Sequence, residues 1–107
     1  MMDVKQYHVR IPNVADVGLA IRIYYENIYL HPAEVRALFG GISYNKAGRL
    51  SRMARDLMRE RGVMSWDDST VNTAIAYEAW GLDIADLEKR YSKLLKYGMR
   101  KEGAVQA

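Results

Sequence analysis

The stretch from His31 to Arg61 predicts a short helix, a tight turn and a longer basic helix; it reads HPAEVRALFGGISYNKAGRLSRMARDLMRER. Its proline suits the first helical position, because the missing N–H would be unpaired there in any case. Glu34 then places negative charge in the first turn, against the positive end of the helix dipole. Apolar residues recur at helical spacing and predict one packing face, made of Val35, Leu38 and Phe39.

Two consecutive glycines, Gly40 and Gly41, end the first helix. Glycine enters left-handed backbone conformations without steric cost, so we expect at least one of the two to have a positive φ. Ser43 follows as a cap for the next helix, because its hydroxyl oxygen accepts a hydrogen bond from a free backbone N–H. The pattern therefore predicts a glycine turn between two helices.

The second helix has two different faces at about 100° per residue. One face is apolar and is expected to pack on the core: Ala47, Leu50, Ala54, Leu57 and Met58. The opposite face is polar and basic, with Asn45, Arg49, Arg52 and Arg59, and with Lys46 and Arg55 on its flanks. From Ser43 to Gly62 the net charge is +4, against +3 for the whole chain, so the positive charge is concentrated in this segment.

One run of residues resembles the helix-turn-helix of small prokaryotic and phage DNA-binding proteins: Glu34, Val35, Leu38, Phe39, Gly40, Ile42, Ser43, Ala47 and Leu50. In that family the second helix enters the major groove, and its outward N-terminal residues touch base edges. The resemblance implies a regulator or an excisionase-like recombination accessory protein. It also implies the DNA-binding residues, which are Ser43, Tyr44, Asn45, Lys46, Arg49 and Arg52, with Arg55 beside them.

The sequence differs from the family pattern at two points. Arg36 occupies a position where the family usually has a small residue, often alanine. The family usually has one glycine in the turn, and the pair Gly40 and Gly41 predicts a turn that is one residue longer.

The rest of the chain predicts an N-terminal arm and three more helices. The arm covers residues 1–13, and Asn13 is expected to cap a helix over 14–29. A helix over 71–80 is apolar nearly all round and is expected to be largely buried. The last helix begins after Asp83 and ends at Gly98.

The segment from Val63 to Val71 allows two interpretations. Val63 to Trp66 and Thr70–Val71 could pair as a hairpin across a turn at Asp67, which would be a wing near residues 63–72. In the other interpretation, Asp68 or Ser69 caps the following helix. Two adjacent aspartates would repel phosphate at the tip of a wing, which favours the second interpretation.

The length of 107 residues predicts one domain over residues 1–98, and the helical patterns predict that it is mainly α, with about five helices around the helix-turn-helix. A disordered tail is expected at 99–107. The absence of cysteine excludes disulfides and thiolate metal sites. No apolar run approaches the roughly 20 residues that span a bilayer, and the N-terminus lacks the apolar segment of a signal peptide. We therefore expect a cytoplasmic protein with no membrane partner.

Catalytic motifs are missing from the sequence. The two histidines, His8 and His31, are isolated, and the chain has no nucleophile elbow, phosphate loop or HExxH pattern. We therefore expect neither an enzyme nor a cofactor or metal site. The expected function is sequence-specific binding of double-stranded DNA. The alternatives are a helical protein-interaction module or a phage packaging component whose basic face binds an acidic partner, and the sequence leaves open whether the protein is a homodimer.

Overall fold

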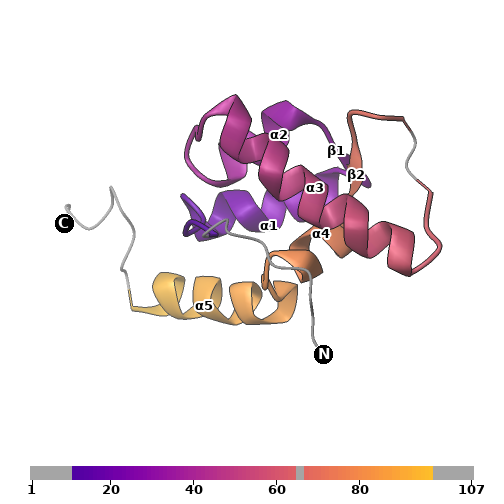
Figure 1. Ribbon diagram of the computed structural model, residues 1–107. Helices are drawn as coiled ribbons and strands as arrows, with labels where there is room; N and C mark the ends of the chain where they lie inside the picture. Colours follow the sequence, from indigo (N-terminus) through magenta and orange to yellow (C-terminus); the bar gives the residue numbers. More distant parts are fainter. Residues whose placement is uncertain (1–10, 65–66, 98–107) are drawn as a thin grey trace.

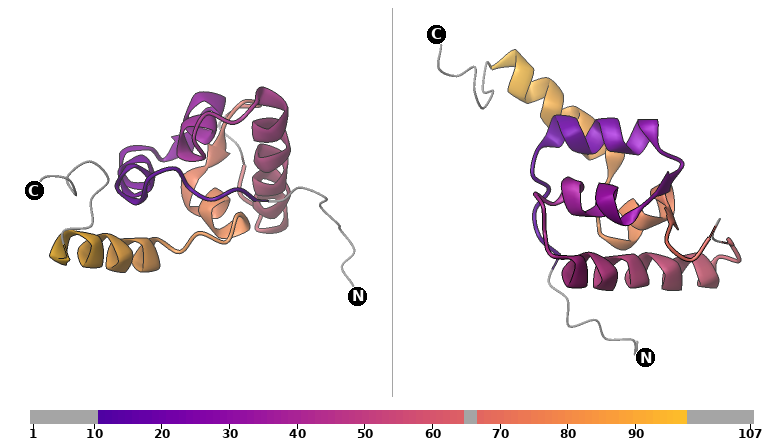
Figure 2. Two further views of the ribbon diagram at one scale, coloured as in Figure 1. Left: turned by 90° about the vertical axis from the view of Figure 1, so that its left-hand side faces the viewer. Right: turned by 90° about the horizontal axis from the view of Figure 1, so that it is seen from above.

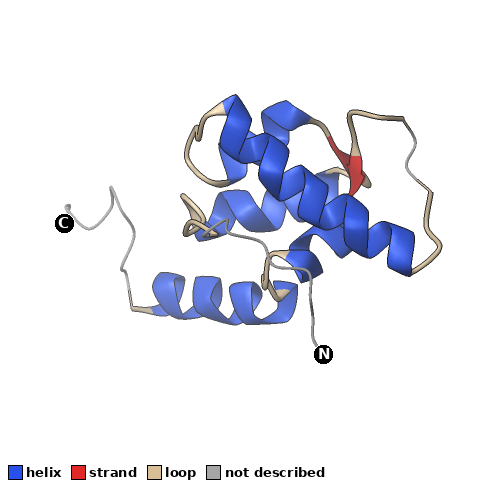
Figure 3. Cartoon of the chain, viewed as in Figure 1, coloured by secondary structure: helices blue, strands red, loops and turns tan. Residues whose placement is uncertain are grey.

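The computed structural model describes residues 11–64 and 67–97, and these confirm the expected mainly α class with five helices (Figures 1 and 3). The predicted tail at 99–107 and residues 1–10 of the predicted arm lie outside the described residues. In chain order the elements are α1 (Val17–Glu26), β1 (Tyr29–Leu30), α2 (Pro32–Leu38), α3 (Tyr44–Glu60), β2 (Val71–Asn72), α4 (Thr73–Ala79) and α5 (Ile84–Lys96).

The helices are arranged so that α3 forms one edge of the molecule (Figure 2). Seen from above, α1, α2 and α3 follow one another across the fold, and α5 lies at the opposite edge. α3 packs against α2 and α4, whereas α5 packs mainly against α1. One long side of α3 is therefore left facing solvent.

The predicted course of the chain from α2 to α3 is confirmed. The N–H of His31 donates to the Glu34 carboxylate over 2.7 Å, which satisfies one of the free donors at the start of α2. Gly40 and Gly41 both have positive φ, at 86° and 82°. Ser43 caps α3 by accepting a hydrogen bond from the N–H of Lys46 over 3.1 Å.

The first helix is shorter at both ends than the predicted span of 14–29. α1 begins after Asp16, whose carboxylate accepts a hydrogen bond from the N–H of Leu19, so Asp16 is the cap in place of Asn13. The helix ends at Glu26, and the side-chain amide of Asn27 donates to the carbonyl of Ile23. The chain then becomes extended as β1.

The wing interpretation is wrong in its pairing. β2 pairs with β1, in antiparallel register with Tyr29 opposite Asn72 and Leu30 opposite Val71. Val63 and Met64 are not in a strand, and residues 65–66 lie outside the described residues. The two-stranded sheet thus joins the chain before α2 to the chain after α3 (Figure 3).

The last two helices lie close to their predicted positions. α4 starts two residues later than expected because Val71 and Asn72 form β2. Its cap is Asn72, whose side chain accepts from the N–H of Ile75 over 3.0 Å, so neither Asp68 nor Ser69 has that role. Asp83 caps α5 as predicted, by accepting from the N–H of Ala85.

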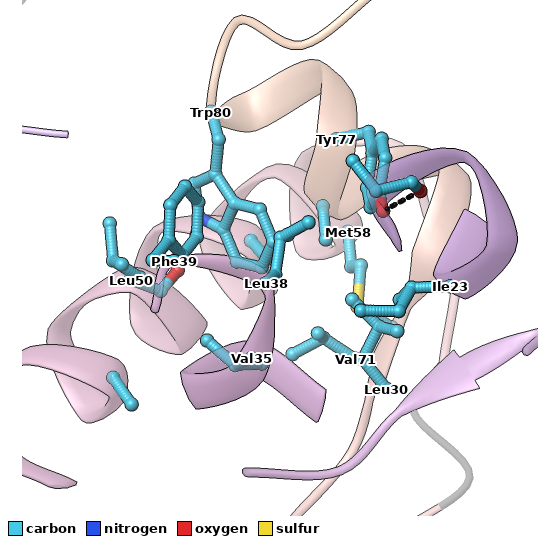
Figure 4. Close-up of a cluster of buried hydrophobic side chains, with 14 of the residues drawn as sticks. Ile23, Leu30, Val35, Leu38, Phe39, Leu50, Met58, Val71, Tyr77 and Trp80 are labelled. Atoms are coloured by element: carbon cyan, nitrogen blue, oxygen red, sulfur yellow. Dashed lines mark hydrogen bonds between the residues drawn. The ribbon is translucent and has the colours of Figure 1, made fainter. Parts of the chain in front are cut away.

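The core lies between the helices and the strand pair (Figure 4). Its fully buried side chains include Val35, Leu38 and Leu50, with Leu30 and Val71 from the sheet. Two aromatic residues of the α4 segment add hydrogen bonds to helix backbone. Tyr77 donates to the Ala20 carbonyl over 2.6 Å, and the indole of Trp80 donates to the Leu50 carbonyl over 2.8 Å. These bonds tie α4 to α1 and α3.

Candidate nucleic-acid interface

The inner side of α3 follows the predicted periodicity with one change. Ala47, Leu50, Ala54 and Met58 are buried as expected, and Ser51 is buried beside them. The predicted core residue Leu57 is only half-buried, because it lies at the margin of the face that α2 and α4 cover.

The outer side of the first half of α3 is basic and open to solvent. Asn45, Lys46, Arg49 and Arg52 are all exposed. Within residues 11–64 and 67–97, the side chains of these four residues have no hydrogen-bond or ion-pair partner. The structure therefore brings together one amide and three cationic groups, none of which the described fold uses.

The second half of α3 differs because the fold uses its cations. Arg55, which the sequence places beside the DNA-binding set, donates to the backbone carbonyl of Asp68 over 2.6 Å. Arg59 forms an ion pair with Asp56 one turn earlier, at 3.0 Å. Arg61 forms a two-point ion pair with Glu78 of α4. The uncommitted positive charge of α3 is thus confined to its first three turns.

The Arg61–Glu78 pair also shifts both ionisation equilibria. Hydrogen bonding to Arg61 lowers the pKa of the Glu78 carboxyl, and the same bond raises the pKa of the Arg61 guanidinium. Both side chains are about half exposed, so this ion pair contributes little to the stability of the fold.

The connection between α3 and β2 carries negative charge. The carboxylate of Asp67 accepts hydrogen bonds from the N–H and the hydroxyl of Ser69, and the backbone bond is the main reason why its pKa is lowered. Asp68 follows directly and is joined to α3 through its carbonyl and Arg55. Two carboxylates therefore lie close to the second half of α3, whereas its first half, from Tyr44 to Arg52, contains no acidic residue.

Arg36 adds a contact at the start of α3 that the sequence pattern does not predict. Its guanidinium carbon lies 4.1 Å from the centre of the Tyr44 ring, and its Nε donates to the Ile42 carbonyl over 2.6 Å. Tyr44 remains 68% exposed, so one part of its ring is held and the rest faces solvent. The sequence feature that could have predicted this contact is an arginine in the last turn of α2 followed, just after the glycine turn, by an aromatic residue.

Gly48 is an unusual residue for its position. It lies in the second turn of α3, on the exposed side, and glycine inside a helix is roughly 0.5–1 kcal/mol less favourable than alanine. A Cβ atom at this position would have nothing within 4 Å in the described structure beyond the local backbone of the helix. The outer face of α3 therefore has a gap in its row of side chains.

The described residues show no metal site and no membrane-spanning element. Among residues 11–64 and 67–97, no group of three histidines, cysteines, aspartates or glutamates is placed to hold a metal ion. Within the same ranges, no helix has both the length and the apolar character needed to cross a membrane. Comparison of the chain with protein-family models, curated proteins and solved structures finds no match.

Proposed function

We propose that this protein binds double-stranded DNA by placing the first half of α3 in the major groove. The supporting observation is the exposed group of Asn45, Lys46, Arg49 and Arg52, whose side chains have no partner within the described structure. These residues belong to α3, which lies at the edge of the part of the fold that the structure describes (Figure 2). The major groove has room for one α-helix.

Two kinds of contact contribute to binding, one to affinity and the other to the choice of DNA sequence. Lys46 and Arg52 neutralise phosphates, which releases condensed counterions and supplies affinity. Asn45 has an amide that pairs with both hydrogen-bonding groups on the major-groove edge of adenine, and Arg49 has a fork that matches guanine. The carboxylates of Asp67 and Asp68 disfavour contact at the other end of α3, so the groove contact is limited to the first three turns.

The biological role that we propose is that of a small transcription regulator or recombination accessory protein of a bacterium, phage or mobile element. This role rests on the helix-turn-helix resemblance of the segment from Glu34 to Leu50. The order of a short helix, a glycine turn and a long helix with an uncommitted outer face supports it.

A salt-titrated binding assay tests the proposal. Fluorescence anisotropy of a labelled duplex is measured with the wild-type protein and with the double variant Arg49→Ala/Arg52→Ala. Both arginines are exposed and lie opposite Ala47 and Leu50, so their removal should leave folding intact. We expect much weaker binding, and a log K against log salt slope that is smaller by about 0.9 for each lost phosphate contact.

The matched control is Lys89→Ala/Lys93→Ala, which removes the same charge from two exposed positions of α5. This control should bind nearly as well as wild type, because α5 lies at the opposite edge (Figure 2). Equal affinities for all three proteins, or no binding by wild type at low salt, would contradict the proposal. The second outcome would leave an acidic protein partner as the ligand of the basic face.

A further inference from the structure

We infer that Gly48 marks the place where the sugar-phosphate backbone of a DNA duplex comes closest to α3. The inference rests on the proposed function and extends it to a residue without a polar side chain. A glycine within an exposed helix weakens that helix. Its presence is explained either by the fold itself, through backbone conformation or packing, or by a binding partner.

Internal reasons are absent from the described structure. Gly48 is not among the glycines with positive φ, so its backbone is one that any residue could adopt. Space is also not limiting, because an added Cβ would meet no heavy atom within 4 Å outside the local backbone. Gly18 in α1 is the contrasting case, since a Cβ there would lie 3.1 Å from the ring of Tyr91. Packing among residues 11–64 and 67–97 accounts for Gly18 and does not account for Gly48.

The neighbours of Gly48 indicate what approaches it. Residues three and four positions apart are adjacent on a helix, so Gly48 lies beside Asn45, Tyr44 and Arg52. Asn45, Arg49 and Arg52 share one line along the helix, and Gly48 lies on one flank of that line, with Lys46 on the other. When this line faces the floor of the major groove, the two flanks face its two walls, which are the sugar-phosphate strands.

The charges favour DNA over a second copy of the chain as the occupant of this gap. Two copies meeting face to face through α3 would oppose Lys46, Arg49 and Arg52 to the same cations, and like charges at short distance repel. A sugar-phosphate strand is complementary to them. With no side chain at Gly48, the backbone of α3 can move closer to that strand. The long side chain of Arg52 then reaches a phosphate of the same strand, and Lys46 reaches the strand on the other side of the groove.

The experiment compares Gly48→Ala and Gly48→Leu with wild type in thermal unfolding and in DNA binding. Alanine and leucine are both good helix formers, so both variants should melt higher than wild type, by about 2 to 6 °C. Binding should change in the opposite direction. We expect a moderate loss of affinity for alanine and a loss of at least about tenfold for leucine. The salt slope should stay near that of wild type, because no charge is removed.

The control is Ala85→Leu, which adds similar bulk at an exposed position of α5 and should leave affinity unchanged. If Gly48→Leu binds like wild type while the double arginine variant does not, the inference is wrong and the proposed function stands. If wild type binds no duplex, the proposed function itself fails. A lower melting temperature for Gly48→Leu would show an internal role, and loss of self-association in sedimentation would identify a second copy as the occupant. Either result would overturn the inference.

Discussion

The guanidinium of Arg36 lies over the ring of Tyr44, at 4.1 Å from its centre, and so joins the last turn of α2 to the first turn of α3. Its Nε also holds the turn between them, through the carbonyl of Ile42. A small residue is usual at this position in the helix-turn-helix family, but here the arginine is half-buried and lies along the turn. Arg36 thus contacts both the turn and the first residue of α3.

We predict that Arg36 and Tyr44 are energetically coupled. A double-mutant cycle of Arg36→Ala and Tyr44→Ala, followed by urea unfolding, should give a coupling free energy of about 0.5–1 kcal/mol, which is the usual range for an exposed cation–π contact. Arg36→Ala should be the more destabilising single variant, since it also removes the bond to Ile42, worth roughly 0.5–1.5 kcal/mol. Strictly additive effects would show that the two groups are in contact without stabilising each other.

The glycine turn should be sensitive to any side chain. Gly40 and Gly41 have φ values of 86° and 82°, where a β-branched residue is strained. Valine at either position should lower the free energy of unfolding by at least ~1 kcal/mol, as measured by denaturant unfolding. Gly48→Ala is the internal control and should have the opposite sign. Melting temperatures equal to wild type for both valine variants would contradict the turn described here.

Asn45 should affect sequence choice more than affinity. Its amide is exposed at the start of α3, and a bidentate contact with adenine is worth about 1–3 kcal/mol of discrimination. A preferred site is first selected from a random duplex library with the wild-type protein. Asn45→Ala should then lose about 1–3 kcal/mol on that site and much less on random duplex. An equal loss on both duplexes would assign Asn45 to the phosphate backbone.

Tyr77 should make stability fall at high pH. Burial raises the pKa of its phenol above the ordinary value of about 10, so the folded state binds this proton more tightly than the unfolded state. The stabilisation is complete below about pH 10 and is lost as pH rises above it, with a slope of up to about 1.4 kcal/mol per pH unit. The free energy of unfolding, measured from about pH 8 to about pH 11, should therefore fall less steeply with pH for Tyr77→Phe than for wild type. The same pH dependence for both proteins would show that another group causes the loss of stability.

The α2–α3 segment can be predicted from its sequence because the rules that shape it are local. The capping residue Ser43, the acid at Glu34 and the paired glycines each act on the backbone within four residues of themselves. The same holds for Asp83 at the start of α5. The exposed face of α3 follows from helical periodicity alone.

Contacts between distant residues cannot be derived in this way. The predicted first helix extends to Tyr29, but the pairing of Tyr29 with Asn72 makes this residue part of a strand. The spacing of Arg55 groups it with the free cations, because nothing in its own segment indicates that its guanidinium donates a hydrogen bond to the Asp68 carbonyl. The role of Arg36 likewise depends on the path of a turn that brings Tyr44 back toward it.

The pairing of Tyr29–Leu30 with Val71–Asn72 has a consequence for the order of folding. Contacts between α2 and α3 form between near neighbours in the chain, whereas this ladder closes a loop from His31 to Thr70 and must overcome the entropy of that closure. We expect the two helices to dock early and the ladder to form after the transition state. Substitutions at Leu30 would then speed unfolding far more than they slow folding. The strand pair would therefore determine how long the native state persists before it unfolds.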